Sequence, residues 1–240
     1  MSTTNPAPAS NDSPPRTPML RLLGVLAVRP VLVLALGLIL VAANLSLIYA
    51  NALVVVIDIA ALAAVGLAMR AEGRGLLDLF RPWRWVDLAW GALMLIILLV
   101  GFLASNFVAN LIVYGGAPPI PTGAPSVPLW VGIVAVLIAP LTIALAEEAV
   151  YRGYAQPRLA GRIDTALALI VVAIVFGIQH IGFALSSPAD VAAKVLTTLF
   201  AGLILGALML WMRRITPLVL AHWGLDLLLL GLPTLMLALA

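Results

Sequence analysis

Few ionisable residues interrupt the long apolar stretches of this chain, and both of its histidines are among them. The set consists of Asp58, Glu147, Glu148, His180, His222 and Asp226. If these stretches lie in a bilayer, an ionisable group at its centre costs at least ~2.5–3.5 kcal/mol on insertion scales, so it indicates function by default. Carboxylates and imidazoles together are the groups that perform general acid–base catalysis or bind a metal ion.

The two adjacent glutamates differ in their predicted partners. Glu148 and Arg152 are four residues apart with the acid first, which is the favourable spacing for a helical ion pair. Mutual neutralisation near the cytoplasmic face explains this pair as well as a role in chemistry does. Glu147 lies about 100° further round the helix and has no local cation. A buried carboxylate without a partner takes up a proton or serves a purpose.

Each histidine has a residue of interest one helical turn away. Phe176 and His180 share a face, and Gly177 beside them allows close helix approach; alone, such a histidine is more often a packing residue than a catalyst. His222 and Asp226 are also four apart, so the carboxylate can orient the imidazole and raise its basicity. The alternative is a polar pair that joins helices. Three such elements on three helices favour one shared site.

The composition indicates that membrane helices position these residues. The chain has 240 residues, 64% hydrophobic and 10% charged, whereas about a quarter of the residues of a soluble domain are charged. At about 20 residues per span, this length holds six to eight spans. The absence of cysteine excludes disulfides and a cysteine nucleophile. The net charge of +3 is small and scattered, which does not favour nucleic acid as a partner.

We therefore predict an all-α, polytopic membrane bundle of about seven transmembrane helices, forming a single domain over 19–240 behind a disordered tail over 1–18. The spans are predicted near 31–49, 52–69, 88–109, 129–155, 165–185, 191–212 and 216–238. A tight turn near 49–51 separates the first two spans, and prolines exclude helix from the loop at 115–128.

The basic residues orient the predicted spans. All the arginines fall before span one or in alternate loops: Arg16, Arg21, Arg29, Arg70, Arg74, Arg81, Arg84, Arg152, Arg158, Arg162, Arg213 and Arg214. Only Lys194 falls on the other side. By the positive-inside rule, the N-terminus is cytoplasmic and the C-terminus external. The chain is expected to be an integral protein of a bacterial cell membrane, with the lipid bilayer as its constant partner.

In this order, the three elements resemble the CAAX protease and bacteriocin-processing (CPBP) family of intramembrane peptidases, which includes the type II CAAX prenyl endopeptidases. The family pattern is EExxxR, then FxxxH, then Hxxx(N/D). The matching residues are Glu147, Glu148, Arg152 with the following Gly153, Phe176, His180, His222 and Asp226. The resemblance covers about 125–240, the predicted peptidase-like core.

The resemblance implies a helical bundle with a cavity open to the cytosol, in which activated water cleaves peptide bonds. On this basis Glu147 is the general base and His180 its partner. His222 and Asp226 stabilise the oxyanion or complete the water site, while the second glutamate and the arginine of the first motif hold the carboxylates. The implied substrates are membrane-associated proteins or peptides, in CAAX-type processing or in bacteriocin or peptide maturation or immunity.

One motif position departs from the prenyl endopeptidases, which carry asparagine where this chain has Asp226. An ionised aspartate would repel an oxyanion, so this residue must be protonated, orient His222 or bind a cation. The HExxH motif of common zinc proteases is absent. Glu147, His180 and His222 could still hold one zinc ion with an open position. The chemistry can be written equally with a divalent metal or without one.

A different class of function also uses such residues. Proton relays place glutamate, aspartate and histidine inside spans, so a transporter or a non-catalytic scaffold or immunity protein on a peptidase-like fold is the alternative. Transporters usually show internal repeats, and none is visible here. The polar residues lie in the C-terminal half except Asp58, which is outside the motifs. Asp58 is either protonated or paired with a cation elsewhere in the bundle.

Overall fold

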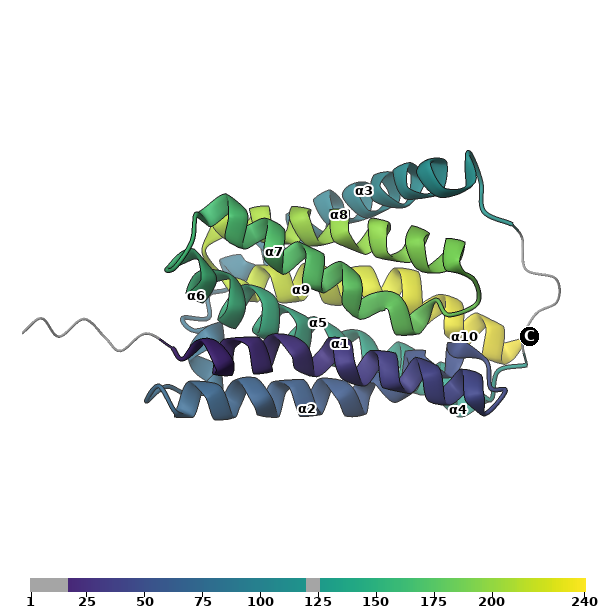
Figure 1. The fold of residues 1–240 in the computed structure, drawn as a ribbon, viewed down its shortest axis with the longest axis horizontal. Coiled ribbons are helices and arrows are strands. Elements are labelled where there is room, and N and C mark those ends of the chain that lie inside the picture. Colours follow the sequence, from purple (N-terminus) through teal and green to yellow (C-terminus); the bar gives the residue numbers. More distant parts are fainter. Residues whose placement is uncertain (1–16, 120–125) are drawn as a thin grey trace, which may run out of the picture.

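The computed structural model describes residues 17–119 and 126–240, and this part of the chain is helical without strands (Figure 1). The α-helices are α1 (Met19–Ala42), α2 (Ala50–Arg70), α3 (Val86–Tyr114), α4 (Leu129–Leu137), α5 (Ala139–Glu147), α6 (Gln156–Ala160), α7 (Thr165–Ile178), α8 (Pro188–Met212), α9 (Ile215–Asp226) and α10 (Leu232–Leu239). Of the predicted tail and the predicted loop, 1–16 and 120–125 lie outside the described residues.

The helices form a membrane bundle, as predicted. Within the described residues, six helical segments are long and apolar enough to cross a bilayer, or seven if the bent pair Leu129–Leu137 and Ala139–Ala160 is one span. The bend of 46° in that pair coincides with Pro140, the second residue of α5. Proline has no backbone N–H to donate to the preceding turn, so the helix bends there.

The first predicted span is misplaced. It was expected at 31–49, whereas α1 begins at Met19 and ends at Ala42. Arg29 and Pro30 lie inside this helix instead of before it. The turn to α2 contains Asn44 in a left-handed conformation, and the hydroxyl of Ser46 accepts from the N–H of Ile48. An arginine can lie within the span because carboxylates of other helices surround it, as described below.

Each of the three motifs includes or directly adjoins a segment that departs from α geometry. A π-helical segment, Glu148–Ala155, follows directly after Glu147. A 3₁₀ segment, Gln179–Phe183, carries His180 at the end of α7. A second π-helical segment, Leu227–Gly231, follows directly after Asp226. π-helical turns occur frequently at functional sites, because they change the direction of side chains within a helix.

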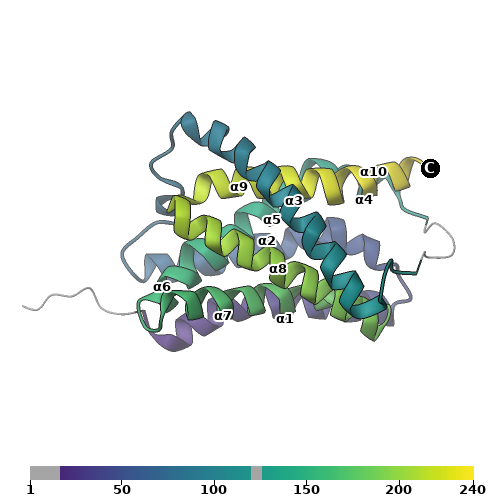
Figure 2. The same ribbon diagram turned by 90° about the horizontal axis from the view of Figure 1, so that it is seen from above.

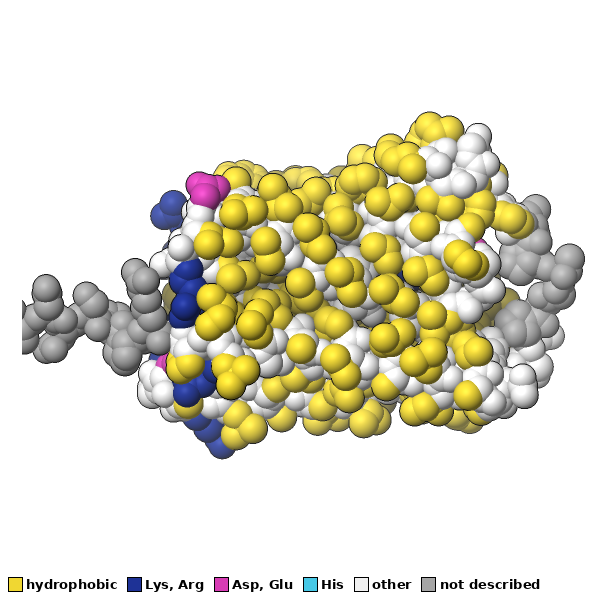
Figure 3. Space-filling view, in the orientation of Figure 1, with side chains coloured by type: hydrophobic (Ala, Val, Ile, Leu, Met, Phe, Trp, Pro, Cys, Tyr) yellow, Lys and Arg dark blue, Asp and Glu magenta, His cyan; other side chains and the backbone are white. Residues whose placement is uncertain are grey.

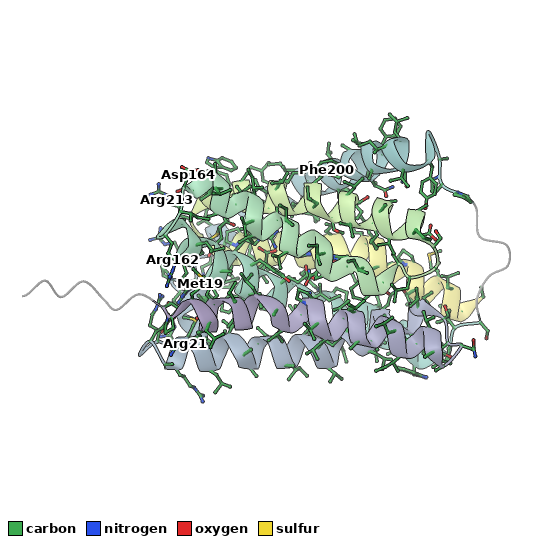
Figure 4. All side chains as sticks on the ribbon, in the orientation of Figure 1. Met19, Arg21, Arg162, Asp164, Phe200 and Arg213 are labelled. Carbon is green, nitrogen blue, oxygen red and sulfur yellow. The ribbon has the colours of Figure 1, made fainter. Side chains whose placement is uncertain are left out.

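The two ends of the bundle differ in charge and in packing. Arginines gather at the end where α1 begins and α2 ends, which we call the arginine end (Figure 3). Arg21, Arg162 and Arg213 mark it in Figure 4. The largest hydrophobic core fills the half of the bundle next to this end, with Leu22 of α1 and Leu218 of α9 among its fully buried members. Only smaller clusters fill the half next to the opposite end.

Candidate active site

The four residues predicted to share one site do line one cavity. Glu147, His180, His222 and Asp226 reach it from α5, the 3₁₀ segment and α9, and its volume is about 560 Å³. The prediction that the three motif helices face each other, rather than lipid, is therefore confirmed. Arg29 of α1 lines the same cavity and was not predicted to do so.

Glu147 has two carboxylate oxygens in different surroundings. Its Oε1 accepts from Arg29 Nη1 and from Gln179 Nε2, the latter at 3.0 Å. Its Oε2 has no hydrogen-bond partner among the described residues and lies 3.6 Å from His222 Nε2. The residue is 2% exposed. The protein thus fixes one oxygen of Glu147 through hydrogen bonds and leaves the other without one.

Arg29 corrects the interpretation that Glu147 has no cation. It is completely buried and forms ion pairs with both Glu147 and Asp58. Its Nε donates to Asp58 Oδ1 at 3.1 Å, and its Nη1 also donates to Gln179 Oε1 at 3.1 Å. The other oxygen of Asp58 accepts from Thr142 at 2.8 Å. Of the two alternatives for Asp58, the structure therefore supports pairing with a cation elsewhere in the bundle.

Gln179 completes this network and was not singled out in the sequence. Its Oε1 accepts from the hydroxyl of Tyr151 at 2.8 Å as well as from Arg29, while its Nε2 donates to Glu147. It immediately precedes His180, and it is polar and 1% exposed. A polar residue next to a motif histidine inside an apolar stretch was the available signal.

Glu148 connects the first motif to the last. Its Oε1 accepts from His222 Nδ1–H at 2.8 Å and from Arg152 Nη1 at 3.4 Å. The predicted ion pair with Arg152 is therefore present, but the glutamate is shared. Arg152 also donates to the carbonyl of Gly202 at 3.2 Å and lies over the ring of Phe176, 4.3 Å from its centroid. These contacts fix Arg152 in the packed core.

The orientation of His222 comes from Glu148 rather than from Asp226. Because Nδ1–H donates to Glu148, the other ring nitrogen faces the cavity. This Nε2 lies 3.6 Å from Asp226 Oδ2 and 3.6 Å from Glu147 Oε2. Asp226 Oδ2 is buried without a hydrogen-bond partner among the described residues. Asp226 thus lies beside the ring nitrogen of His222 that Glu148 does not bind.

The orientation of the His180 ring is fixed by a hydrogen bond to a backbone carbonyl. Its Nδ1–H donates to the carbonyl of Phe176 at 2.8 Å, which leaves Nε2 as the acceptor. The segment that carries it packs closely on α1, because Gly37 and Gly182 touch and a Cβ on either would collide with the backbone of the other helix. The same helix, α1, therefore supports His180 and supplies Arg29.

Negative charge exceeds positive charge around the cavity. Four carboxylates lie in or next to the cavity lining, Asp58, Glu147, Glu148 and Asp226, against three cations, Arg29, Arg152 and Lys194. A buried charge without a counter-charge is unfavourable, so protons must compensate part of this excess. His222 is the nearest group that can carry one, because carboxylates face both of its ring nitrogens.

The described residues do not form a metal site in this arrangement. No three histidine, aspartate or glutamate side chains within 17–119 and 126–240 converge as ligands. The partners of Glu147 Oε1 and of Nδ1 of each histidine leave one atom of each residue of the suggested zinc set without such a bond, but the three residues do not converge as ligands in this arrangement. The chemistry proposed below therefore uses protein groups alone.

Comparison with known families agrees with the motifs. Residues 125–228 match the family described as type II CAAX prenyl endopeptidase Rce1-like. No curated protein and no solved structure matches the chain. The matched region contains every motif residue and excludes Arg29 and Asp58. The chain is thus an integral multi-pass membrane protein, and over residues 125–228 it shares the pattern of the Rce1-like family of CAAX-type intramembrane proteases.

Proposed function

We propose that this protein is an intramembrane endopeptidase that hydrolyses peptide bonds of membrane-associated substrates with water activated by Glu147. The observation that carries the proposal is the environment of this one carboxylate. Arg29 and Gln179 bind Oε1, whereas Oε2 is buried, has no hydrogen-bond partner among the described residues and faces His222. A general base must be within reach of the proton it abstracts, and Glu147 is one of the residues that line the cavity.

The first step is the attack of water on the substrate carbonyl. Glu147 Oε2 takes one proton of the water, and the acceptor nitrogen Nε2 of His180 binds the other hydrogen. The water oxygen then bonds to the carbonyl carbon, and the C=O electrons move to oxygen. His180 can act as this acceptor because its Nδ1–H already donates to Phe176.

The second step breaks the peptide bond. His222, as an imidazolium whose Nδ1–H is bound to Glu148, donates its Nε2–H to the oxyanion. Asp226 in its protonated form adds no negative charge beside this oxyanion. The C–N bond then breaks as the C=O bond re-forms, and the proton on Glu147 passes to the leaving nitrogen. The carboxylate is regenerated, and the products are a carboxylic acid and an amine.

Arg29 is a positioning residue in this scheme. Its guanidinium binds Asp58 on one side and Glu147 on the other, so it fixes the side of the carboxylate that does not react. The fork geometry of arginine suits such a two-sided contact better than the point charge of lysine. The N-terminal helices therefore complete a site whose motif residues all lie in 125–228.

The test is peptide cleavage by the purified, membrane-reconstituted protein. We expect the wild type to cleave members of a peptide library, and a chelator to leave the rate unchanged. Glu147→Ala should be inactive while retaining its helical circular dichroism. Loss of activity with chelator would instead indicate a metal-dependent site. If neither protein cleaves any peptide, the non-catalytic scaffold or transporter becomes the better hypothesis.

A further inference from the structure

We infer that substrate reaches the site from the end of the bundle opposite the arginine end, which makes it an extracytoplasmic segment of a membrane-associated peptide or protein. This inference rests on the proposed function for the identity of the substrate. The route itself follows from two observations that involve no catalysis. These are the shape of the cavity and the distribution of arginines.

The cavity extends from the catalytic residues towards the opposite end. Its lining includes Leu47 and Ile48 in the short helical turn before α2, and Asn51 at the second residue of α2. Phe183 at the end of the 3₁₀ segment and Lys194 in the second turn of α8 also line it. All five belong to the ends of helices that are remote from the arginine end (Figure 1).

The cavity also reaches the side of the bundle. Asn106 of α3 and Leu229 of the second π-helical segment line it, and both are exposed on the surface. Figure 2 shows that α3 crosses α8 and α9 obliquely and is separated from α10 at its C-terminal end. The cavity mouth is therefore bounded by α3 and the second π-helical segment. It lies in the half of the bundle that lacks the largest hydrophobic core.

The arginine end offers no comparable route. Between the catalytic residues and that end lies the largest hydrophobic core, in which Tyr151, Tyr154 and Leu218 are fully buried. Glu148 and Arg152 are completely buried beneath it. The cavity lining contains no residue of the loops at the arginine end. Access from this end would require the core to open.

The arginines assign the two ends to the two sides of the membrane. Two arginines counted as loop residues in the sequence, Arg29 and Arg152, are buried in the bundle. The described arginines that remain all lie at the arginine end: Arg21, Arg70, Arg74, Arg81, Arg84, Arg158, Arg162, Arg213 and Arg214. The positive-inside rule makes this end cytoplasmic. The cavity mouth is then extracytoplasmic, in contrast to the cytosolic opening that the family resemblance implied.

The absence of native cysteine allows a direct test by single-cysteine labelling. Asn51 lies in the cavity lining and is half-buried, and Asn106 lies at the mouth. Ala71 is exposed directly after α2, at the arginine end, and serves as the matched control. In intact cells, a membrane-impermeant maleimide should label Asn51→Cys and Asn106→Cys but not Ala71→Cys. In inside-out vesicles, only Ala71→Cys should react.

Labelling of Ala71→Cys in intact cells, or of the cavity cysteines only in inside-out vesicles, would overturn the inference. So would cavity cysteines that react from neither side. A second measurement separates this inference from the proposed function. A peptide that the purified protein cleaves should also be cleaved when added outside sealed right-side-out vesicles. Cleavage in detergent but not from outside would refute the route and leave the peptidase activity established.

Discussion

The two oxygens of Glu147 differ because residues distant in the sequence bind one of them. Arg29 is 118 residues away and Gln179 is 32 residues away. Effective catalysis requires the reacting oxygen to be held in place before substrate arrives. In this site the requirement is met by a buried network around Oε1, rather than by a contact to Oε2. Changes in that network should therefore affect the rate without removing the base.

Arg29→Lys tests this network. Lysine keeps the positive charge but cannot bind Asp58 and Glu147 through one planar fork. We expect kcat to fall by about 10²-fold, the effect of a misplacement of about 1 Å, with KM little changed. Steady-state kinetics against Arg21→Lys, a half-exposed position on the same helix, provides the comparison. Wild-type kcat in Arg29→Lys would contradict a positioning role.

Asp226→Asn tests the protonation of the carboxyl group beside His222. An amide of nearly the same shape carries no charge, as the proposed protonated aspartic acid does. We therefore expect this variant to retain activity within a few-fold, whereas removing the oxyanion donor in His222→Gln should cost about 10²–10³ in kcat. If Asp226→Asn is as inactive as His222→Gln, the aspartate acts in its ionised form and the proposed role is wrong.

At the scale of elements, the site depends on how closely α1 packs on the 3₁₀ segment that carries His180. Gly182 lies against the backbone of Val33 and Leu34, so this contact tolerates no side chain. Gly37 contributes the equivalent close approach from α1. Since α1 also supplies Arg29, one helix–helix contact supports both the proposed base, Glu147, and its proposed histidine partner.

Gly182→Ala should disrupt this contact. The added methyl overlaps the backbone of Val33, and overpacking of this kind typically costs about 1–3 kcal/mol. We expect a lower thermal midpoint and reduced turnover, because the His180 segment must shift. The matched control is Gly24→Ala on α1, where a Cβ meets nothing within 4 Å. Equal stability and activity for the two variants would show that the close approach is unimportant.

A second contact between elements lies at the arginine end and is formed by hydrogen bonds to Glu72. Glu72, after α2, accepts hydrogen bonds from Arg158, Thr17 and Tyr154. Partial burial alone would raise the pKa of Glu72, but the hydrogen bonds, with Arg158 first, outweigh it and lower this pKa below its usual 4.5. A carboxyl group with a lowered pKa stabilises the fold above its unfolded-state pKa and loses this contribution as pH falls through the folded-state value.

The stability difference between wild type and Glu72→Gln should therefore be largest at neutral pH. It should shrink as the pH falls below about 4.5, the usual value for this group. Thermal unfolding of both proteins across this range measures it. A difference that is the same at neutral and acidic pH would mean that the ionised form of Glu72 makes no special contribution.

At the scale of the whole molecule, two parts of the chain build one site. The region 125–228 carries all three motifs, and motif spacing was sufficient to predict which of its residues meet. The contributions of α1 and α2 could not be predicted in the same way. Arg29 and Asp58 are unmatched charges in separate apolar stretches, and no local spacing connects them. Their pairing follows only from the arrangement of the helices.

The boundary of the first span was wrong for the same reason. An arginine next to a proline indicates the end of a membrane segment when its partners are unknown. In the folded protein, Asp58 and Glu147 compensate the charge of Arg29, so the helix continues through Met19–Ala42. The other spans follow from apolar length alone, which does not depend on tertiary partners, and these predictions came close to the observed helices.

The most direct test of the account is the turnover of Glu147→Gln in reconstituted membranes, with Glu72→Gln as the control for the same chemical change at the arginine end. Glutamine keeps the size of the side chain and can still bind Arg29 through its oxygen, but it cannot take a proton from water. Loss of a general base typically costs about 10²–10⁴-fold. We predict a loss of that size in kcat for Glu147→Gln, and wild-type turnover for Glu72→Gln at neutral pH. Equal turnover of Glu147→Gln and wild type would contradict the assignment of Glu147 as the base.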